Sequence, residues 1–207
     1  MKLKKLTTHD IVLMALLAVG NGVLTFFTAY INQMLTAVGG PIATSTITGI
    51  YMVYGVLAMY IIRKPGAAFG TYMIGATVQS LFGISYGAAS AYVAALCYAV
   101  IIEAVFAIIR YKYWGYITVS LASLLAVPLW FIGAAYMYGY WAWEGSVQIF
   151  GIDIHVLLAA FMIRCMSGII LCGIVTKLIG VGLERAGWLK WFSAGRGRVT
   201  YAETESV

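Results

Sequence analysis

The stretch Ile11–Tyr30, IVLMALLAVGNGVLTFFTAY, runs for 20 residues without a charged side chain, shortly after a basic start that contains Lys2, Lys4 and Lys5. About 20 apolar residues are what an α-helix needs to cross the hydrocarbon core of a bilayer. The apolar core of a secretory signal peptide is shorter, roughly 7–15 residues. We therefore expect this stretch to stay in the protein as a first transmembrane helix.

The composition of the whole chain indicates an integral membrane protein. Apolar residues make up 63% of the 207 positions and charged residues only 10%, with a mean hydropathy of +0.94. In soluble domains about a quarter of the residues are charged. A net charge of +6 would suggest nucleic-acid binding in a soluble domain, but here the cations lie between apolar runs. We therefore expect membrane lipid around the chain and no nucleic-acid partner.

The distribution of Lys and Arg predicts how the chain crosses the membrane. Cytoplasmic loops carry an excess of these residues, and the turns near Gly39, Ser85 and Trp143 contain none. Six spans with both termini in the cytoplasm satisfy this pattern. All basic residues except Arg164 fall into four clusters: Lys2, Lys4 and Lys5; Arg63 and Lys64; Arg110 and Lys112; and Lys177, Arg185, Lys190, Arg196 and Arg198.

We therefore predict an all-α integral membrane bundle of six helices within residues 1–186. A basic and aromatic cytoplasmic tail should follow in residues 187–207. Thr7-x-x-Asp10 has the spacing of a capping box and marks the start of the first helix. The expected spans are residues 11–32, 42–62, 67–82, 88–109, 114–138 and 154–178, of which the third is short.

Polar side chains recur at helical spacing along the first expected helix. Asn21, Thr25, Thr28 and Asn32 lie at positions i, i+4, i+7 and i+11, so they share one face. Backbone and side-chain polar groups are costly against hydrocarbon unless they are satisfied. We expect this polar stripe to face protein or water, and Asn32 to be a candidate ligand contact.

Small residues form a second stripe beside the first. Ala15, Ala18 and Gly22 lie next to the polar face, and Ala18-x-x-x-Gly22 has the spacing that lets another helix approach closely. Two interpretations remain open for this small-residue stripe, namely packing within the chain and docking of a partner subunit. We take its three residues as the candidate docking residues.

Glu103 and Arg164 are charged residues deep inside expected spans. An Arg at the centre of a membrane helix costs roughly 2.5–3.5 kcal/mol on insertion scales, which suggests a functional site. Ala99 beside Glu103, and Ala160 and Gly168 beside Arg164, leave room for a ligand. The two charges could form a structural ion pair or contact a ligand in a solvated cavity, and these interpretations are compatible.

The remaining candidate ligand contacts are amide and aromatic side chains on other helices, together with residues of the outer loop. Aromatic faces can stack on a planar ligand, and amide groups can bond its polar edge. Together with Glu103, Arg164 and Asn32, the predicted substrate-binding residues are Gln79, Tyr51, Tyr86, Tyr92, Trp141 and His155.

The sequence lacks the motifs of common enzymes. It has no G-x-x-x-x-G-K-[ST] phosphate loop, no G-x-S-x-G elbow and no H-E-x-x-H helix. His9 and His155 belong to opposite membrane faces, and no third metal ligand accompanies them. We therefore expect no enzymatic activity, no cofactor and no metal, so any uphill transport must be driven by a partner.

Several short motifs occur in the order found in one family of membrane proteins. They are Thr7-x-x-Asp-Ile-Val12, Gly40-Pro-Ile-Ala43, Ile62-Arg-Lys-Pro-Gly-Ala-Ala68, Glu103-Ala-Val-Phe106 and Arg164-x-x-Ser-Gly168. With six expected spans and no ATPase motif, the chain resembles the S components of energy-coupling factor (ECF) vitamin transporters. Within that class it is similar to the YkoE-type proteins, which are associated with thiamine or its hydroxymethylpyrimidine (HMP) moiety.

The resemblance implies a subunit of a prokaryotic cytoplasmic membrane that captures thiamine or HMP from outside. It further implies docking through the first helices onto a transmembrane coupling subunit that works with two cytoplasmic ATPases. A carboxylate such as that of Glu103 can accept a bidentate pair of hydrogen bonds from the exocyclic amine and the protonated ring nitrogen of an aminopyrimidine. The alternative is a stand-alone small-solute channel or ion-coupled secondary transporter, while a membrane enzyme is disfavoured by the missing motifs.

Overall fold

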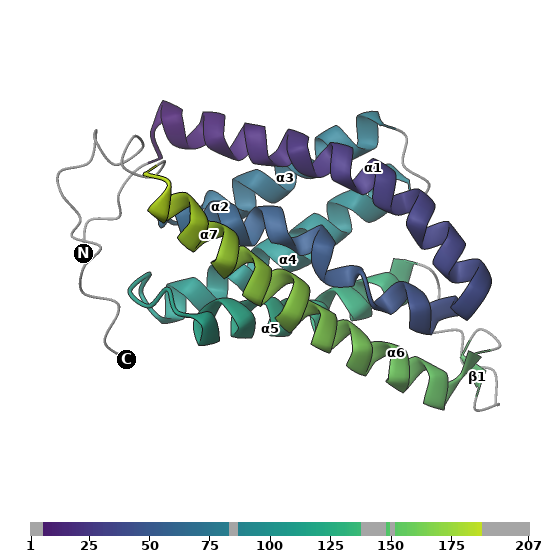
Figure 1. The fold of residues 1–207 in the computed structure, drawn as a ribbon. Helices are drawn as coiled ribbons and strands as arrows, with labels where there is room; N and C mark the ends of the chain where they lie inside the picture. Colours follow the sequence, from purple (N-terminus) through teal and green to yellow (C-terminus); the bar gives the residue numbers. More distant parts are fainter. Residues whose placement is uncertain (1–5, 83–86, 138–147, 150–151, 188–207) are drawn as a thin grey trace.

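The computed structural model describes residues 6–82, 87–137, 148–149 and 152–187, which form an elongated helical bundle (Figure 1). A two-stranded antiparallel sheet is its only β-structure in the described part. In chain order the elements are α1 (Thr8–Ser45), the 3-10 helix η1 (Thr48–Met52), α2 (Val53–Ile62), α3 (Ala67–Leu81), α4 (Ala88–Ile108), α5 (Tyr116–Met137), β1 (Gln148–Ile149), β2 (Ile152–Asp153), α6 (Ile154–Ser167), the π-helix η2 (Gly168–Ile174) and α7 (Val175–Arg185).

The bundle is that of an all-helical membrane protein. Of the predicted spans, the third falls short, because α3 has 15 residues and is therefore only about 22 Å long against the roughly 30 Å of a hydrocarbon core. Within the described residues, five helical segments are long and apolar enough to cross a membrane: Thr8–Gly40, Ile42–Ile62, Ala88–Ile108, Tyr116–Gly133 and Leu157–Arg185.

The first helix is longer than the sequence predicted. We expected it to end at Asn32, but the helix continues to Gly40 before the chain turns. The polar residues after Asn32 do not end the helix, because the Thr36 hydroxyl donates to the Asn32 carbonyl oxygen at 2.7 Å. Gly40 has a φ of +56°, a left-handed conformation that glycine adopts without a steric penalty. The second apolar segment begins after this turn, as expected from Pro41.

The predicted capping box at the start of α1 is confirmed. The Asp10 carboxylate accepts a hydrogen bond from the Thr7 backbone N–H at 2.8 Å. Asp10 also pairs with Lys64, and both side chains are almost fully buried. This contact ties the start of α1 to the turn between α2 and α3.

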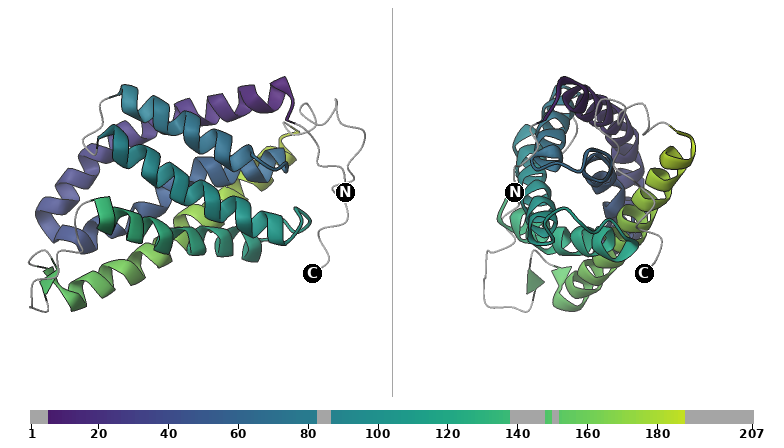
Figure 2. Two further views of the ribbon diagram at one scale, coloured as in Figure 1. Left: turned by 180° about the vertical axis from the view of Figure 1, so that it is seen from behind. Right: turned by 90° about the vertical axis from the view of Figure 1, so that its left-hand side faces the viewer.

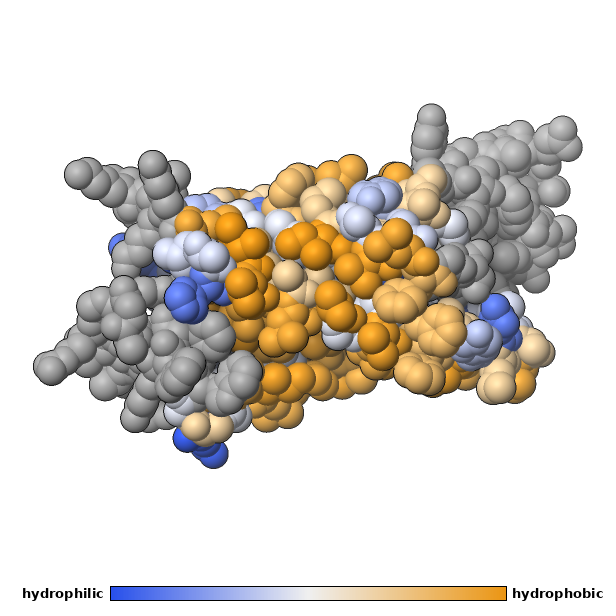
Figure 3. All heavy atoms as spheres, turned by 90° about the horizontal axis from the view of Figure 1, so that it is seen from above, coloured by the Kyte–Doolittle hydropathy of each residue, from blue (hydrophilic) through white to orange (hydrophobic). Residues whose placement is uncertain are grey.

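α2 forms the centre of the bundle. Its residues from Tyr54 to Ile62 are all buried, and in the view along the bundle the other helices surround it (Figure 2). On the face seen in Figure 3, mostly apolar side chains cover the middle of the bundle, and the most hydrophilic residues lie toward its ends. Exposed residues such as Val12, Leu16 and Ile117 are thus placed to contact lipid.

The start of α1 and the ends of α2, α4 and α7 lie at one end of the bundle, which we call the basic end (Figure 1). Arg63 there pairs with Glu184, with 3.0 Å between Nη2 and Oε1. Three of the four predicted basic clusters thus have residues at the same end. That this end faces the cytoplasm stays a prediction, as does a separate tail, since residues 188–207 lie outside the described part.

Candidate ligand site

Arg164 lies on α6, about two turns from the end of the span that is opposite the basic end. Its Nε donates a hydrogen bond to the Ser45 hydroxyl at 3.0 Å. Its guanidinium carbon lies 5.5 Å from the ring centroid of Phe131 on α5. Among the described residues it has no carboxylate partner. A charged side chain in this position is a candidate for ligand binding.

Ser167 lies one helical turn after Arg164 and binds the segment that follows Ser45. Its hydroxyl donates to the Thr46 carbonyl oxygen at 2.7 Å and accepts from the Gly49 N–H at 2.9 Å. Gly49 lies so close that an added Cβ would be 2.2 Å from the Ser167 carbonyl oxygen. The Arg164-x-x-Ser-Gly motif therefore fixes the segment between α1 and η1 against α6.

Two irregular helical segments meet at this point. η1 follows the turn of residues 46–47, and η2 begins directly after Ser167. π-helical segments are rare and frequently occur at functional sites. Non-helical backbone at membrane depth is tolerated where it is buried in protein or lines a cavity. The surroundings of Arg164 thus combine a charge with irregular backbone, which favours a ligand site.

The polar stripe of α1 faces the interior, as predicted. Asn21, Thr25 and Thr28 are 4–5% exposed, and Thr28 bonds the Leu24 carbonyl oxygen at 3.0 Å. The Nε2 of Gln79 on α3 lies 3.5 Å from the Thr25 hydroxyl, which is a long and weak hydrogen bond. In the described structure, neither the amide nitrogen nor the amide oxygen of Asn21 has a partner. Such a group is costly unless water or a ligand satisfies it.

A series of aromatic rings crosses the interior from α2 to α5. The ring centroids of Tyr54 and Tyr72 are 4.9 Å apart, those of Tyr72 and Tyr98 are 5.9 Å apart, and those of Tyr98 and Trp130 are 6.1 Å apart. The hydroxyl of Tyr72 donates to the Met52 carbonyl oxygen at 2.7 Å. None of these four aromatics is among the predicted substrate-binding residues. The runs that contain Tyr54, Tyr98 and Trp130 are apolar on nearly every face, so no spacing distinguishes these three.

Glu103 lies toward the basic end, on α4, and does not pair with Arg164. Its Oε1 accepts hydrogen bonds from the backbone N–H groups of Ala68 at 3.0 Å and Phe69 at 3.4 Å, at the start of α3. Its Oε2 accepts from the Tyr111 hydroxyl at 3.0 Å. Of the two interpretations that the sequence left open for these charges, the ion pair with Arg164 is thus not found among the described residues. A carboxylate at a helix N-terminus is stabilised by the helix dipole, which gives Glu103 a structural task.

Tyr111 keeps its proton in this arrangement. Burial raises the pKa of Tyr111, and the nearby Glu103 carboxylate raises it further. The phenol therefore remains a hydrogen-bond donor to Glu103 at any physiological pH. The pair links the end of α4 to the start of α3.

Replacing Glu103 by glutamine should lower stability and leave ligand affinity within about twofold. Glutamine keeps an acceptor oxygen but loses the charge at the α3 N-terminus, worth about 1–2 kcal/mol in a partly buried setting. Thermal unfolding in one detergent would measure the first effect and calorimetry the second. Tyr111→Phe, which removes one hydrogen bond and no charge, is the control and should cost less. If the Glu103→Gln variant is stable but binds the ligand more weakly, Glu103 is a ligand contact after all.

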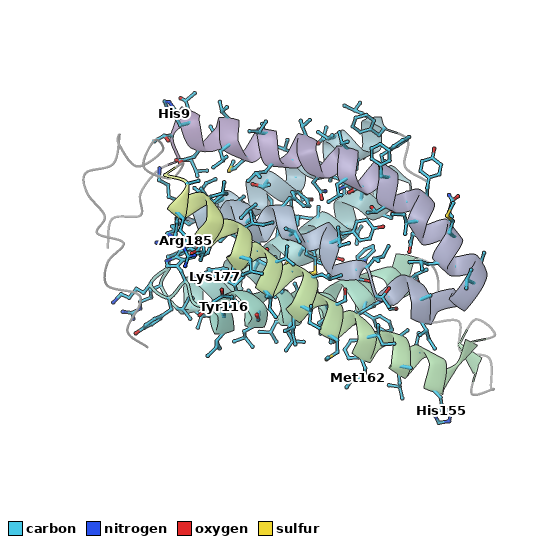
Figure 4. All side chains as sticks on the ribbon, viewed as in Figure 1. His9, Tyr116, His155, Met162, Lys177 and Arg185 are labelled. Atoms are coloured by element: carbon cyan, nitrogen blue, oxygen red, sulfur yellow. The ribbon has the colours of Figure 1, made fainter. Side chains whose placement is uncertain are left out.

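The other predicted contact residues are spread over the bundle. Tyr92 is exposed on α4 and its hydroxyl lies 3.0 Å from that of Thr77 on α3. His155 is exposed at the start of α6 and points away from the helices (Figure 4). Asn32 and Tyr51 are half-buried, and each has an interaction partner in the chain. Tyr86 and Trp141 lie outside the described residues.

The small-residue stripe packs within the chain. Ala18 is 0% exposed, and an added Cβ at Gly22 would lie 2.4 Å from the Val78 side chain of α3. Ala15 is half-buried. The structure thus favours internal packing over docking for these three residues, since a partner could reach Ala18 and Gly22 only if α1 and α3 separated.

A family model described as "ABC-type cobalt transport system, permease component" matches residues 9–129, which is more than half of the chain. The chain belongs to this family. Its sequence is 29% identical over 194 residues to the protein YkoE of Bacillus subtilis (strain 168), which is named as a candidate HMP/thiamine permease, and the match covers 94% of this chain and 92% of YkoE.

A solved structure, described as the crystal structure of an S-component of an ECF transporter, has the same fold. Its TM-score with this chain is 0.80, with 29% sequence identity over 92% of each chain. The chain is an ECF S component, a substrate-binding membrane subunit without enzymatic activity. This assignment confirms the resemblance found in the sequence and decides against the stand-alone channel, the secondary transporter and the membrane enzyme.

Proposed function

We propose that this S component binds the neutral aminopyrimidine HMP beside Arg164, and binds thiamine more weakly. The name of YkoE supports the vitamin class. The observation that carries the proposal is the guanidinium of Arg164, held by Ser45 and Phe131 with no carboxylate among its described neighbours. Its remaining N–H groups can donate to the ring nitrogens or the hydroxyl group of HMP. The half-buried Phe131 ring beside the guanidinium offers apolar surface to the pyrimidine.

The charge of Arg164 distinguishes the two vitamins. Thiamine carries a positively charged thiazolium ring, whereas HMP is neutral at pH 7. Two like charges about 8 Å apart repel by about 2 kcal/mol at an effective dielectric constant of about 20. This repulsion corresponds to a factor of roughly 30 in affinity.

The expected partners are a transmembrane coupling subunit and two cytoplasmic ATPases in a bacterial cytoplasmic membrane. The sequence has no phosphate loop of its own, so uptake against a gradient requires an energising module. α1 can dock through its lipid-facing side, since Leu16 and Val19 are exposed and Gly20 has nothing within 4 Å of an added Cβ. This exposed face replaces the buried small-residue stripe as the docking surface we propose.

Calorimetric titration of the purified chain in detergent should show HMP binding at least tenfold tighter than thiamine. The physical reason is the repulsion between Arg164 and the thiazolium ring. The two ligands share the pyrimidine ring, so the comparison reports the effect of the thiazolium ring.

The outcomes separate the parts of the proposal. If thiamine binds as tightly as HMP or more tightly, Arg164 does not lie close to the thiazolium ring. Absence of binding by both ligands, with a folded protein, would refute the vitamin assignment. Uptake by the chain alone in liposomes under an ion gradient would contradict the need for an energising module.

A further inference from the structure

Lys177 joins α7 to the loop before α5 at the basic end. Its ammonium group donates to the Tyr60 hydroxyl at 2.8 Å and to the Trp114 carbonyl oxygen at 3.1 Å. A lysine ammonium has three N–H donors, and no described residue accepts the third. The nitrogen also lies 5.8 Å from the ring centroid of the exposed Tyr116. Lys177 is only half-buried, so a ligand at the surface can reach it.

The surroundings of Lys177 carry an excess of positive charge. Arg63 lies over the Trp114 ring at 5.2 Å and is paired with Glu184. Arg185 is exposed, and among the described residues it has no hydrogen-bond or ion-pair partner. The described surroundings of Lys177 thus contain one carboxylate, that of Glu184, for three cations, which are Arg63, Lys177 and Arg185. Figure 4 shows Tyr116, Lys177 and Arg185 at the same end of the bundle, far from His155.

Apolar side chains continue from this charge along both helices. α5 and η2 approach each other closely, since an added Cβ at Gly173 would lie 2.5 Å from the Ser120 hydroxyl. Lys177 lies one turn beyond this contact. On either side of it the helices expose apolar residues, namely Ile117 and Leu121 on α5, Ile174 on η2 and Leu178 on α7.

We propose that Lys177, with Arg185 and Tyr116, binds the phosphate headgroup of an anionic phospholipid whose acyl chains lie along α5 and α7. A phosphate accepts charge-assisted hydrogen bonds from Lys and Arg, and basic sites between membrane helices bind anionic headgroups. The exposed apolar residues next to the cation favour a lipid over a free phosphate, because they give its acyl chains a surface. The lipid would bridge α7 and the start of α5 and so stabilise the distance between these two helices.

The test uses the full chain, delipidated and placed in phosphatidylcholine nanodiscs with or without phosphatidylglycerol. Native mass spectrometry counts the phosphatidylglycerol molecules that stay bound. The wild type should retain it, and Lys177→Gln should weaken retention about fivefold, the effect of one lysine near a membrane surface. Arg185→Gln, which removes no contact within the described structure, should weaken it as well. Lys177→Arg should restore binding, and the exposed Lys112→Gln is the matched control.

Three outcomes would overturn the proposal. Equal loss with Lys112→Gln would show unspecific attraction to the basic end. Tight binding of inorganic phosphate that depends on Lys177 would show a phosphate site without lipid. If Lys177→Gln and Arg185→Gln both retain phosphatidylglycerol but no longer co-purify with ATPase subunits, the basic end is a protein interface and not a lipid site. Because HMP binding is measured separately, none of these results bears on the proposed ligand.

Discussion

Lys64→Met should destabilise the protein by about 3–5 kcal/mol, the usual cost of removing one partner from a buried ion pair. The Lys64 and Asp10 side chains are 4% and 1% exposed. The same Asp10 oxygen accepts hydrogen bonds from the Thr7 backbone N–H and hydroxyl, both at 2.8 Å. Without Lys64 the carboxylate stays buried without its counter-charge. The free energy of unfolding, measured by titration with SDS in mixed micelles, would give the effect.

A double variant separates the lost charge from the lost packing. Asp10→Asn combined with Lys64→Met leaves no buried charge, and asparagine can still accept from the Thr7 N–H. Most of the lost stability should therefore return. The exposed Lys112→Met at the same end is the matched control and should change stability by less than about 0.5 kcal/mol. A double variant as unstable as Lys64→Met would show that packing, not the loss of the charge pair, causes the loss of stability.

Five of the six expected spans match helical segments long and apolar enough to cross a membrane. They could be predicted because membrane insertion depends on length and apolar content. Three of the four basic clusters have described residues at one end of the bundle, as the sequence predicted, with Arg63 and Lys64 beside Glu184 and Asp10. The inward face of α1 could be predicted because Asn21, Thr25 and Thr28 are polar residues in an otherwise apolar helix. Their spacing therefore shows which face of α1 points inward.

The inward face of α4 could not be predicted. Nearly all of its residues are apolar, so no periodicity distinguishes the protein side from the lipid side. Tyr92 and Glu103 were predicted to share the ligand-facing side, whereas Tyr98 lies in the core and Tyr92 is exposed. Glu103 was predicted to bind a ligand or Arg164, because a sequence does not show that α3 begins beside it with free N–H groups. Long-range contacts of this kind depend on how the helices pack.

The surroundings of Arg164 could be predicted from the sequence only in part. The intramembrane charge was evident, but its partners Ser45 and Phe131 come from distant parts of the chain. The hydrogen bond to Ser45 uses one of five N–H donors. Arg164 is half-buried, and its other donors have no partner among the described residues, so they are available to a ligand or to water. The nearby Ser167 holds the backbone that positions Ser45.

Arg164→Gln should weaken HMP binding about 10–100-fold, because a hydrogen bond to a charged group contributes about 1.5–3 kcal/mol. Glutamine can keep the contact with Ser45, so the fold should persist, and calorimetry on a protein with an unchanged unfolding temperature would measure the affinity. The same change should narrow the preference for HMP over thiamine, since the repelling charge is gone. Arg110→Gln, at the opposite end, is the matched control and should alter neither value.

Arg164→Lys distinguishes charge from geometry. Lysine keeps the positive charge but cannot offer two parallel N–H donors in one plane. If HMP is held by a planar pair of hydrogen bonds, this variant should bind it as weakly as Arg164→Gln while still rejecting thiamine. If lysine supports full affinity, a point charge is sufficient and the planar arrangement is wrong. A folded Arg164→Gln protein that binds HMP as tightly as the wild type would instead place the ligand elsewhere, with the unpaired amide of Asn21 as the next site to test.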